Sequence, residues 1–305
     1  MRIVVHGQQS FGKAVLEALL ERGEDVIAAY VAPDREDRPP DPLKDFALER
    51  GLPVYQPASY KTPGVWDAFR ALSPDLCVMA FVTLIVPEEF LYIPNHGSIQ
   101  YHPSLLPSHR GPSSINWPIM QGATKTGLSI FWPDNGLDTG PVLLQKEVDI
   151  GPDDTLGTIY FDKLFPLGVE AMVEALDLVK QGEAPRIVQD DSQATYESWC
   201  SASEAEIDWA QPAQEVHDLI RGTDPVPGAW TNVGAQTVQL FGSARAREGT
   251  SGTSGEILAI NEYGMTVAAP GGAVQVARLR AKGGKKLAAA EAAAELGLSV
   301  GDRLG

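Results

Sequence analysis

The sequence has few of the residues on which several common kinds of functional site depend. Only two of its 305 residues are cysteine, Cys77 and Cys200, too few and too far apart to suggest a disulfide framework or a thiolate zinc site. Basic residues are also scarce: 24 Lys and Arg face 40 Asp and Glu, which makes the formal net charge −16. That balance disfavours a broad binding surface for nucleic acid. We expect both thiols to be structural.

Long apolar runs are missing as well. No stretch approaches the roughly 20 residues of a membrane-spanning helix, and the start, MRIVVHGQQSFG, is typical of a strand and a turn rather than of a signal peptide. We therefore expect a cytoplasmic protein without a membrane partner. Its 44% hydrophobic and 21% charged residues are those of an ordinary globular chain, long enough for one large domain or two moderate ones.

The first half of the chain alternates strands with helices. Apolar runs at 2–6, 25–32 and 75–82 predict strands, and the last of these is typical of a parallel strand covered on both faces. Segments 11–23 and 42–51 have apolar residues at helical spacing and end at a glycine. This alternation predicts an α/β fold with a doubly wound, mostly parallel sheet, in which ligands lie beyond the carboxyl ends of strands.

The carboxyl-terminal third changes character. From about residue 256, short alternating segments are separated by Asn/Gly and Pro-Gly-Gly turns, which predicts a small antiparallel β unit. GTSGTSG at 249–255 predicts a flexible surface loop, and AAAEAAAEL at 288–296 predicts a short helix. We place the boundary so that 1–204 form the first domain and 205–305 the second.

The most informative segment is GSIQYHPSLLPSHRGPSSINWP at 97–118, where a short predicted strand leads to His102 at the start of a loop. Pro103, Pro107 and Pro112 restrict this loop, since proline fixes its own φ and limits the conformation of its neighbour. Such a loop would hold the imidazole in the preorganised position that a catalytic group needs.

A second polar turn follows in SIFWPDNGLDTGPVLLQKEVDI at 129–150, which predicts strand, turn and strand. The turn contains Asp134, Gly136 and Asp138, and Asp138 comes 36 residues after His102. A helix plus a strand of that length can return the chain to the neighbourhood of the first loop in an α/β sheet. We therefore expect His102 and Asp138 to meet.

The segments HPSLLPSHRG and GLDTGPVL together resemble the folate-dependent formyltransferase family. The resemblance covers almost the whole chain, and within the family it is strongest to the amino-terminal hydrolase domain of 10-formyltetrahydrofolate dehydrogenase, through DDTLGTIYFDKLFPLGVEAMV and IRGTDPVPGAW. Methionyl-tRNA formyltransferase is also similar. The resemblance implies a Rossmann-like catalytic domain, a smaller OB-like β domain, and 10-formyltetrahydrofolate as cosubstrate without a metal.

The resemblance also implies a catalytic set. The family has an Asn, a His two residues later and an Asp on the second loop, and the last two fall on His102 and Asp138. The Asn position falls on Gln100, whose amide stands on a stem one methylene longer. Protonated His102 and Gln100 would stabilise a tetrahedral oxyanion, each donor contributing roughly 3 kcal/mol, while Asp138 would hold the imidazole and help to deprotonate the nucleophile.

For the folate, the resemblance indicates the run AFVTLIVPEEF at 80–90, directly after a predicted buried strand. A pterin needs an apolar slot with backbone hydrogen bonds. We expect apolar residues of this run to form the slot and backbone groups of the second turn, 134–138, to supply the hydrogen bonds. The resulting candidates for folate binding are Phe81, Leu84, Ile85, Val86, Asp134 and Gly136.

The formyl acceptor stays open between an amine, a carrier thiol and water. The alternatives to transfer are hydrolysis to formate and tetrahydrofolate, transfer to methionyl-tRNA, and a folate-binding module without turnover. Five basic residues at 278–286 favour tRNA, and the acidic balance weighs against it. Ser104 lacks the G-x-S-x-G context of a nucleophile, whereas His109 and Arg110 could hold the loop, contact folate or form a solvated face.

Overall fold

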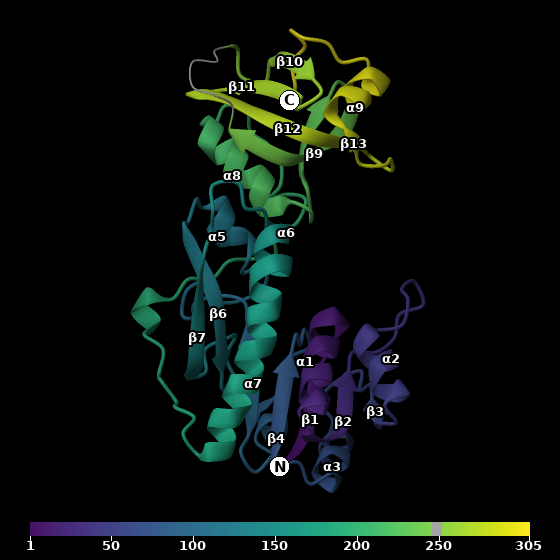
Figure 1. Ribbon diagram of the computed structural model, residues 1–305, viewed down its shortest axis with the longest axis vertical. Helices are drawn as coiled ribbons and strands as arrows, with labels where there is room; N and C mark the ends of the chain where they lie inside the picture. The colour runs from purple at the N-terminus through teal and green to yellow at the C-terminus, as the bar shows by residue number, and fades with distance from the viewer. Residues whose placement is uncertain (246–251) are drawn as a thin grey trace. The chain divides into compact units, whose positions relative to one another are not determined.

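The computed structural model describes residues 1–245 and 252–305, which form two compact units (Figure 1). The first unit comprises Met1–Gly111, Gly127–Glu147 and Lys163–Tyr196. The second comprises Pro112–Thr126, Val148–Asp162 and Glu197–Gly305. Each unit is thus assembled from segments distant in the sequence. The predicted contiguous domains 1–204 and 205–305 stay a prediction.

The first unit is built on a seven-stranded sheet with the order β3-β2-β1-β4-β5-β6-β7. Its strands are β1 (Arg2–Gly7), β2 (Asp25–Val31), β3 (Val54–Tyr55), β4 (Leu76–Ala80), β5 (Ser98–His102), β6 (Lys125–Phe131) and β7 (Val142–Asp149). The pairs from β3 to β5 are parallel, and β6 is antiparallel to β5. The predicted α/β fold with a mostly parallel sheet is confirmed.

The two adjacent parallel strands β1 and β4 are almost completely buried. Every residue of β4 is buried, as are all but the first of β1, because helices cover a parallel sheet on both faces. The chain adds β2 and β3 on one side of β1 and then β4 to β7 on the other. The strand order therefore reverses between β1 and β4, and the carboxyl ends of strands near such a reversal are where ligands bind in α/β folds.

Helices of the first unit pack along this sheet. They are α1 (Gln9–Glu21), α2 (Pro42–Glu49), α3 (Pro63–Ala71), α4 (Glu88–Leu91) and α7 (Phe165–Gln181), with a 3₁₀ turn at Asp191–Gln193. α1 contacts both α2 and α7, and Figure 1 shows α1 and α7 side by side. Asp41 caps α2 by accepting a hydrogen bond from the Leu43 amide, as helix-starting aspartates do.

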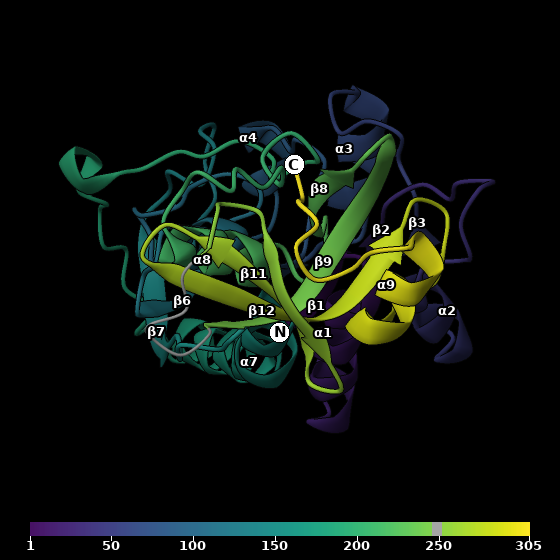
Figure 2. The same cartoon turned by 90° about the horizontal axis from the view of Figure 1, so that it is seen from above.

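The second unit contains a six-stranded antiparallel sheet. Its strands are β8 (Ala229–Val233), β9 (Gln236–Arg245), β10 (Ile257–Asn261), β11 (Gly264–Ala269), β12 (Gly272–Ala281) and β13 (Leu287–Ala288). The order is β10-β11-β12-β9-β8, with β13 paired to β12. Figure 2 labels four of these strands, β8, β9, β11 and β12. The helical segments are α5 (Asn116–Met120), α6 (Leu156–Thr158), α8 (Ala213–Thr223) and α9 (Ala289–Leu296), and a π-helical stretch, Ile159–Leu164, follows α6.

The predicted antiparallel unit after residue 256 and the short helix near the end are confirmed. The strands β8 and β9 are not predicted from the sequence. The alternation of β9 is interrupted by Gly242, which has a left-handed backbone. The predicted loop at 249–255 falls partly outside the described residues. No helix of the described chain is both long and apolar enough to cross a membrane.

Candidate functional site

His102 is the last residue of β5, and not the first residue of the following loop as the sequence analysis expects. It is 6% exposed and has neighbours on both sides, since β5 lies between β4 and β6. The Nε2–H group donates to the His109 carbonyl at 2.8 Å, because a carbonyl oxygen can only accept. The loop after β5 therefore folds back and fixes the imidazole through one ring nitrogen.

The other ring nitrogen of His102, Nδ1, faces Asp138. Nδ1 and the Asp138 Oδ2 atom are 3.6 Å apart, and both side chains are more than 90% buried. This distance is that of a charge contact and is longer than a hydrogen bond. The two residues that the sequence analysis expects to meet do lie together, with their polar atoms facing each other.

Asp138 is held by the loop that carries His109. Its Oδ2 atom accepts a hydrogen bond of 2.8 Å from the Gly111 amide, and its backbone has a left-handed φ of 56°. Left-handed backbone is unfavourable for residues other than glycine, although Asp tolerates it better than most. The surrounding contacts therefore impose this conformation, which is a frequent property of functional residues.

The route by which Asp138 arrives differs from a parallel crossover. His102 pairs with Ser129 and Gln100 pairs with Phe131, so β6 runs back along β5 toward its amino end. The chain then turns through the segment 132–141, which we call the Asp loop, and enters β7. Asp138 lies on the returning half of this loop.

Gln100 lies two residues before His102 on β5, so both side chains point to the same face of the sheet. It is half-buried, and its amide makes no hydrogen bond with any residue in the part of the chain that the structure describes. It therefore has a free donor beside the His102–Asp138 pair.

The residues predicted to form the folate slot follow β4, the parallel neighbour of β5. Met79 pairs with Gln100, so the residue after β4, Phe81, lies level with His102. Phe81 is 44% exposed and has a left-handed φ of 65°, while Ile85 is 79% exposed. Leu84 and Val86 are half-buried and pack against the core of the first unit. Phe81 and Ile85 thus expose apolar surface just after the carboxyl end of β4, the strand next to β5.

The turn predicted to complete the slot is shaped by its own side chains. Asp134 Oδ1 accepts hydrogen bonds from the Gly136 amide at 3.0 Å and from the Thr139 hydroxyl at 2.6 Å. This is a common way for an aspartate to stabilise a turn. Asp134 Oδ1 is thus used within the turn, which leaves the backbone of 134–138 as its contribution to a ligand.

Arg110 holds the loop and is not part of a solvated face, since it is 2% exposed. Burial opposes its charge, but hydrogen bonds to Asp191 (2.7 Å) and Tyr196 (2.6 Å) outweigh this and raise the pKa of the guanidinium. Two further N–H groups of Arg110 donate to Gln189 Oε1 at 3.1 and 2.8 Å. Gln189 is not singled out from the sequence, because it belongs to no recognisable motif and to no periodic pattern of apolar residues.

Ser104 is structural in this fold. Its side chain is fully buried, and its hydroxyl donates to the Ser108 carbonyl at 2.7 Å. The Ser129 hydroxyl bridges the same loop, donating to the Ser104 carbonyl and accepting from the Leu106 amide. A nucleophilic role for Ser104 is therefore not supported.

Two other histidines and part of the basic segment also have structural partners. His6 pairs with Tyr60 and His217 with Ser243 and the Pro152 carbonyl, and burial lowers the pKa of both imidazoles. In the basic segment, Arg280 and Lys286 both lie over the Phe241 ring. Part of that charge is therefore engaged within its own unit.

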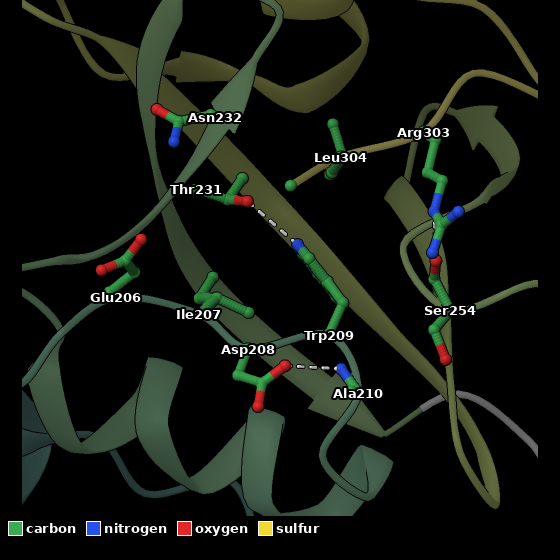
Figure 3. Close-up of a pocket in the computed structure, with 11 residues that line it drawn as sticks. Glu206, Ile207, Asp208, Trp209, Ala210, Thr231, Asn232, Ser254, Arg303 and Leu304 are labelled. Atoms are coloured by element: carbon green, nitrogen blue, oxygen red, sulfur yellow. Dashed lines mark hydrogen bonds between the residues drawn. The ribbon is translucent and has the colours of Figure 1, made fainter.

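Two cavities lie elsewhere. One of about 640 Å³, in the second unit, is bordered by the segment 206–210 and by residues 303–305, with the Trp209 indole donating to Thr231 (Figure 3). Another of about 440 Å³, in the first unit, lies around 94–97 at the amino end of β5. Neither is lined by His102 or Asp138. Among described residues, no group of three or more His, Cys, Asp or Glu side chains could hold a metal ion.

Comparison with known proteins identifies relatives with assigned activities. The profile of the formyl transferase family matches residues 1–176, and that of the formyl transferase C-terminal domain matches 200–296. Cytosolic 10-formyltetrahydrofolate dehydrogenase from Xenopus tropicalis is 46% identical over 249 residues, which cover 80% of this chain. The match spans only 28% of that relative's length.

A second relative matches over nearly its full length. Methionyl-tRNA formyltransferase from Trichlorobacter lovleyi is 38% identical over 308 residues, covering 99% of this chain and 96% of the relative. Among solved structures, HypX from Aquifex aeolicus in complex with tetrahydrofolic acid superimposes with a TM-score of 0.71 at 22% identity, covering 98% of this chain and 48% of HypX. That likeness concerns the fold alone.

Proposed function

Because this chain belongs to the formyl transferase family, we propose that it removes the formyl group from 10-formyltetrahydrofolate and passes it to an acceptor, with His102 and Asp138 at the reacting carbon. The observation that carries this proposal is the approach of His102 Nδ1 to Asp138 Oδ2, at 3.6 Å, beside the free amide of Gln100. The apolar surface of Phe81 and Ile85 at the same edge of the sheet suits a pterin ring.

The reaction would proceed through a tetrahedral intermediate. The acceptor's nucleophilic atom forms a bond to the formyl carbon, and the carbonyl electrons move to oxygen. Since His102 Nε2 is committed to the His109 carbonyl, the nitrogen available to the oxyanion is Nδ1, with Gln100 as second donor. Asp138 takes the acceptor's proton, the bond between carbon and N10 breaks, and N10 takes up a proton to leave tetrahydrofolate.

Hydrolysis is the second candidate, and a specific observation favours it. The higher identity, 46%, is to a 10-formyltetrahydrofolate dehydrogenase. In that case water is the acceptor and formate the product. Transfer to methionyl-tRNA is supported by the other relative, which matches almost end to end. The net charge of −16 opposes tRNA binding, so any such reaction should weaken steeply with added salt.

One experiment separates these outcomes. The protein is incubated with 10-formyltetrahydrofolate alone, with a panel of small amines and carrier thiols, and with charged initiator tRNA at rising salt, while tetrahydrofolate formation is followed. Release without an acceptor indicates hydrolysis, and release that requires an amine, a thiol or tRNA indicates transfer. Binding of folate without any product would support the folate-binding module and contradict our proposal.

His102→Ala and Asp138→Ala test the assigned pair. Each should lower formyl release by about 10²-fold or more, because each removes a group that handles a proton or stabilises charge in the transition state. Ser104→Ala, which removes a hydroxyl engaged with the Ser108 carbonyl, is the control and should retain most activity in any fraction that folds. Activity within a few-fold of wild type in both pair variants would contradict the assignment.

A further inference from the structure

The segment after α7 crosses the Asp loop, which carries Asp138, and the loop that follows His102. We call residues 185–196 the strap. It begins against the Asp loop and the start of β7, where the Pro185 carbonyl accepts from the Trp132 indole at 2.9 Å and Ile187 exchanges two backbone hydrogen bonds with Val142. It ends against the loop after β5, where Thr195 exchanges backbone hydrogen bonds with Arg110 and Pro107. The strap therefore bridges two loops that are distant in the sequence.

Gln189 is the residue of the strap that touches both loops with one side chain. Its Nε2 group donates to the carbonyls of Asp138, at 2.9 Å, and Gly140, at 2.6 Å. Its Oε1 atom accepts from Arg110, which follows His109, the residue whose carbonyl fixes His102. At 9% exposure the amide has little access to water, so these hydrogen bonds have no ready substitute.

We infer that Gln189 is a positioning residue, which sets the approach of Asp138 to His102 by joining the Asp loop to Arg110. This rests on the proposed function. Gln189 lies between the ranges matched by the two family profiles, which end at 176 and begin at 200. The chain between the catalytic and carboxyl-terminal sequence matches is thus a part of the active-site framework.

The geometry indicates why the amide of glutamine is suited here. The position needs an N–H donor for two carbonyls of the Asp loop and, on the same planar group, an acceptor for a buried guanidinium. Leucine supplies neither, and a charged glutamate supplies only the acceptor. Comparison of Gln189→Leu with Gln189→Glu therefore separates the hydrogen bonds to the Asp loop from those to Arg110.

The test uses the full chain. Gln189→Leu should lower kcat for formyl release by about 10- to 100-fold, as expected for a misplacement of about 1 Å, with a smaller change in KM for 10-formyltetrahydrofolate. Gln189→Glu should show most of the same loss. Gln193→Leu is the matched control, because Gln193 is an exposed glutamine of the same strap whose side chain bonds only Ser192 among the described residues, at 3.4 Å. This variant should stay within twofold of wild type.

Hydrogen exchange gives a readout that does not depend on turnover. The Gly111 amide, which donates to Asp138, should exchange faster in Gln189→Leu and Gln189→Glu than in wild type or Gln193→Leu. If Gln189→Leu does not fold, the kcat and the Gly111 exchange rate of Gln189→Glu decide the test. Unchanged kcat in a folded Gln189 variant, a change in KM alone, or unchanged exchange at Gly111 would overturn the inference. Absence of formyl release by wild type would instead contradict the proposed function, and the exchange experiment would still test whether Gln189 holds the Asp loop against the loop that contains Arg110.

Discussion

At the scale of single residues, the two nitrogens of one imidazole have different partners. Nε2 is occupied by the His109 carbonyl, which orients the ring, and Nδ1 faces Asp138. The motif in the sequence singles out His102 but not which nitrogen faces Asp138. The order of residues does not determine which partner each ring nitrogen of His102 contacts. Only the tertiary structure shows this.

Gln100 is the residue whose role the sequence leaves most open, and its free amide makes it testable. Gln100→Leu should lower kcat by about 10²-fold if the amide stabilises the oxyanion, since loss of one such donor costs roughly 3 kcal/mol. Gln100→Asn keeps the amide on a shorter stem and should retain more activity than Gln100→Leu. Because Gln100 makes no described side-chain hydrogen bond, thermal stability should change little, and unchanged kcat in the leucine variant would assign the residue a passive role.

At the scale of elements, the Asp loop shows how backbone shape places a carboxylate. Trp132 and Pro141 are joined by a backbone hydrogen bond at the base of the loop, and the Asp134 carboxylate organises its tip. Gly140 lies where a Cβ would come within 1.7 Å of the Trp132 carbonyl oxygen. The loop can therefore close only with glycine at that position.

Gly140→Ala should open the base of the Asp loop and displace Asp138. We expect a loss of about 1 to 3 kcal/mol in the free energy of unfolding, as for other overpacked sites, together with a large loss of formyl release. Gly64→Ala in α3 is the control, because nothing lies within 4 Å of its added Cβ, and it should be neutral or slightly stabilising. Denaturant unfolding and activity assays of both variants provide the measurement, and wild-type behaviour of Gly140→Ala would refute the steric argument.

At the scale of the whole molecule, stability should fall on mild acidification in part because of His6. This residue is 3% exposed, and burial lowers its pKa from 6.5 to about 3. Below pH 6.5 the unfolded chain therefore binds a proton that the folded chain excludes. The stability that His6 contributes is present above pH 6.5 and is lost as the pH falls toward 3.

The corresponding experiment is urea unfolding between pH 6.5 and 4. Wild type should lose stability more steeply than His6→Phe, by at most about 1.4 kcal/mol per pH unit, which is the limit for one proton. His96→Gln, at an exposed position, is the control and should keep the wild-type slope. Parallel pH profiles for wild type and His6→Phe would show that the buried imidazole is not the cause.

What the sequence determined by itself was the kind of chemistry and most of the local structure. Two short motifs singled out His102 and Asp138 as candidates, and apolar periodicity was enough for β1, β2, β4, α1 and α2 of the first unit, because both signals lie within a few neighbouring residues. The order of strands, the antiparallel return of β6, and the hydrogen bonds of Gln189 to residues about 50 and 79 positions away were decided only by the tertiary structure. Such contacts depend on which distant backbone groups the fold leaves unpaired. The local sequence does not determine which groups these are.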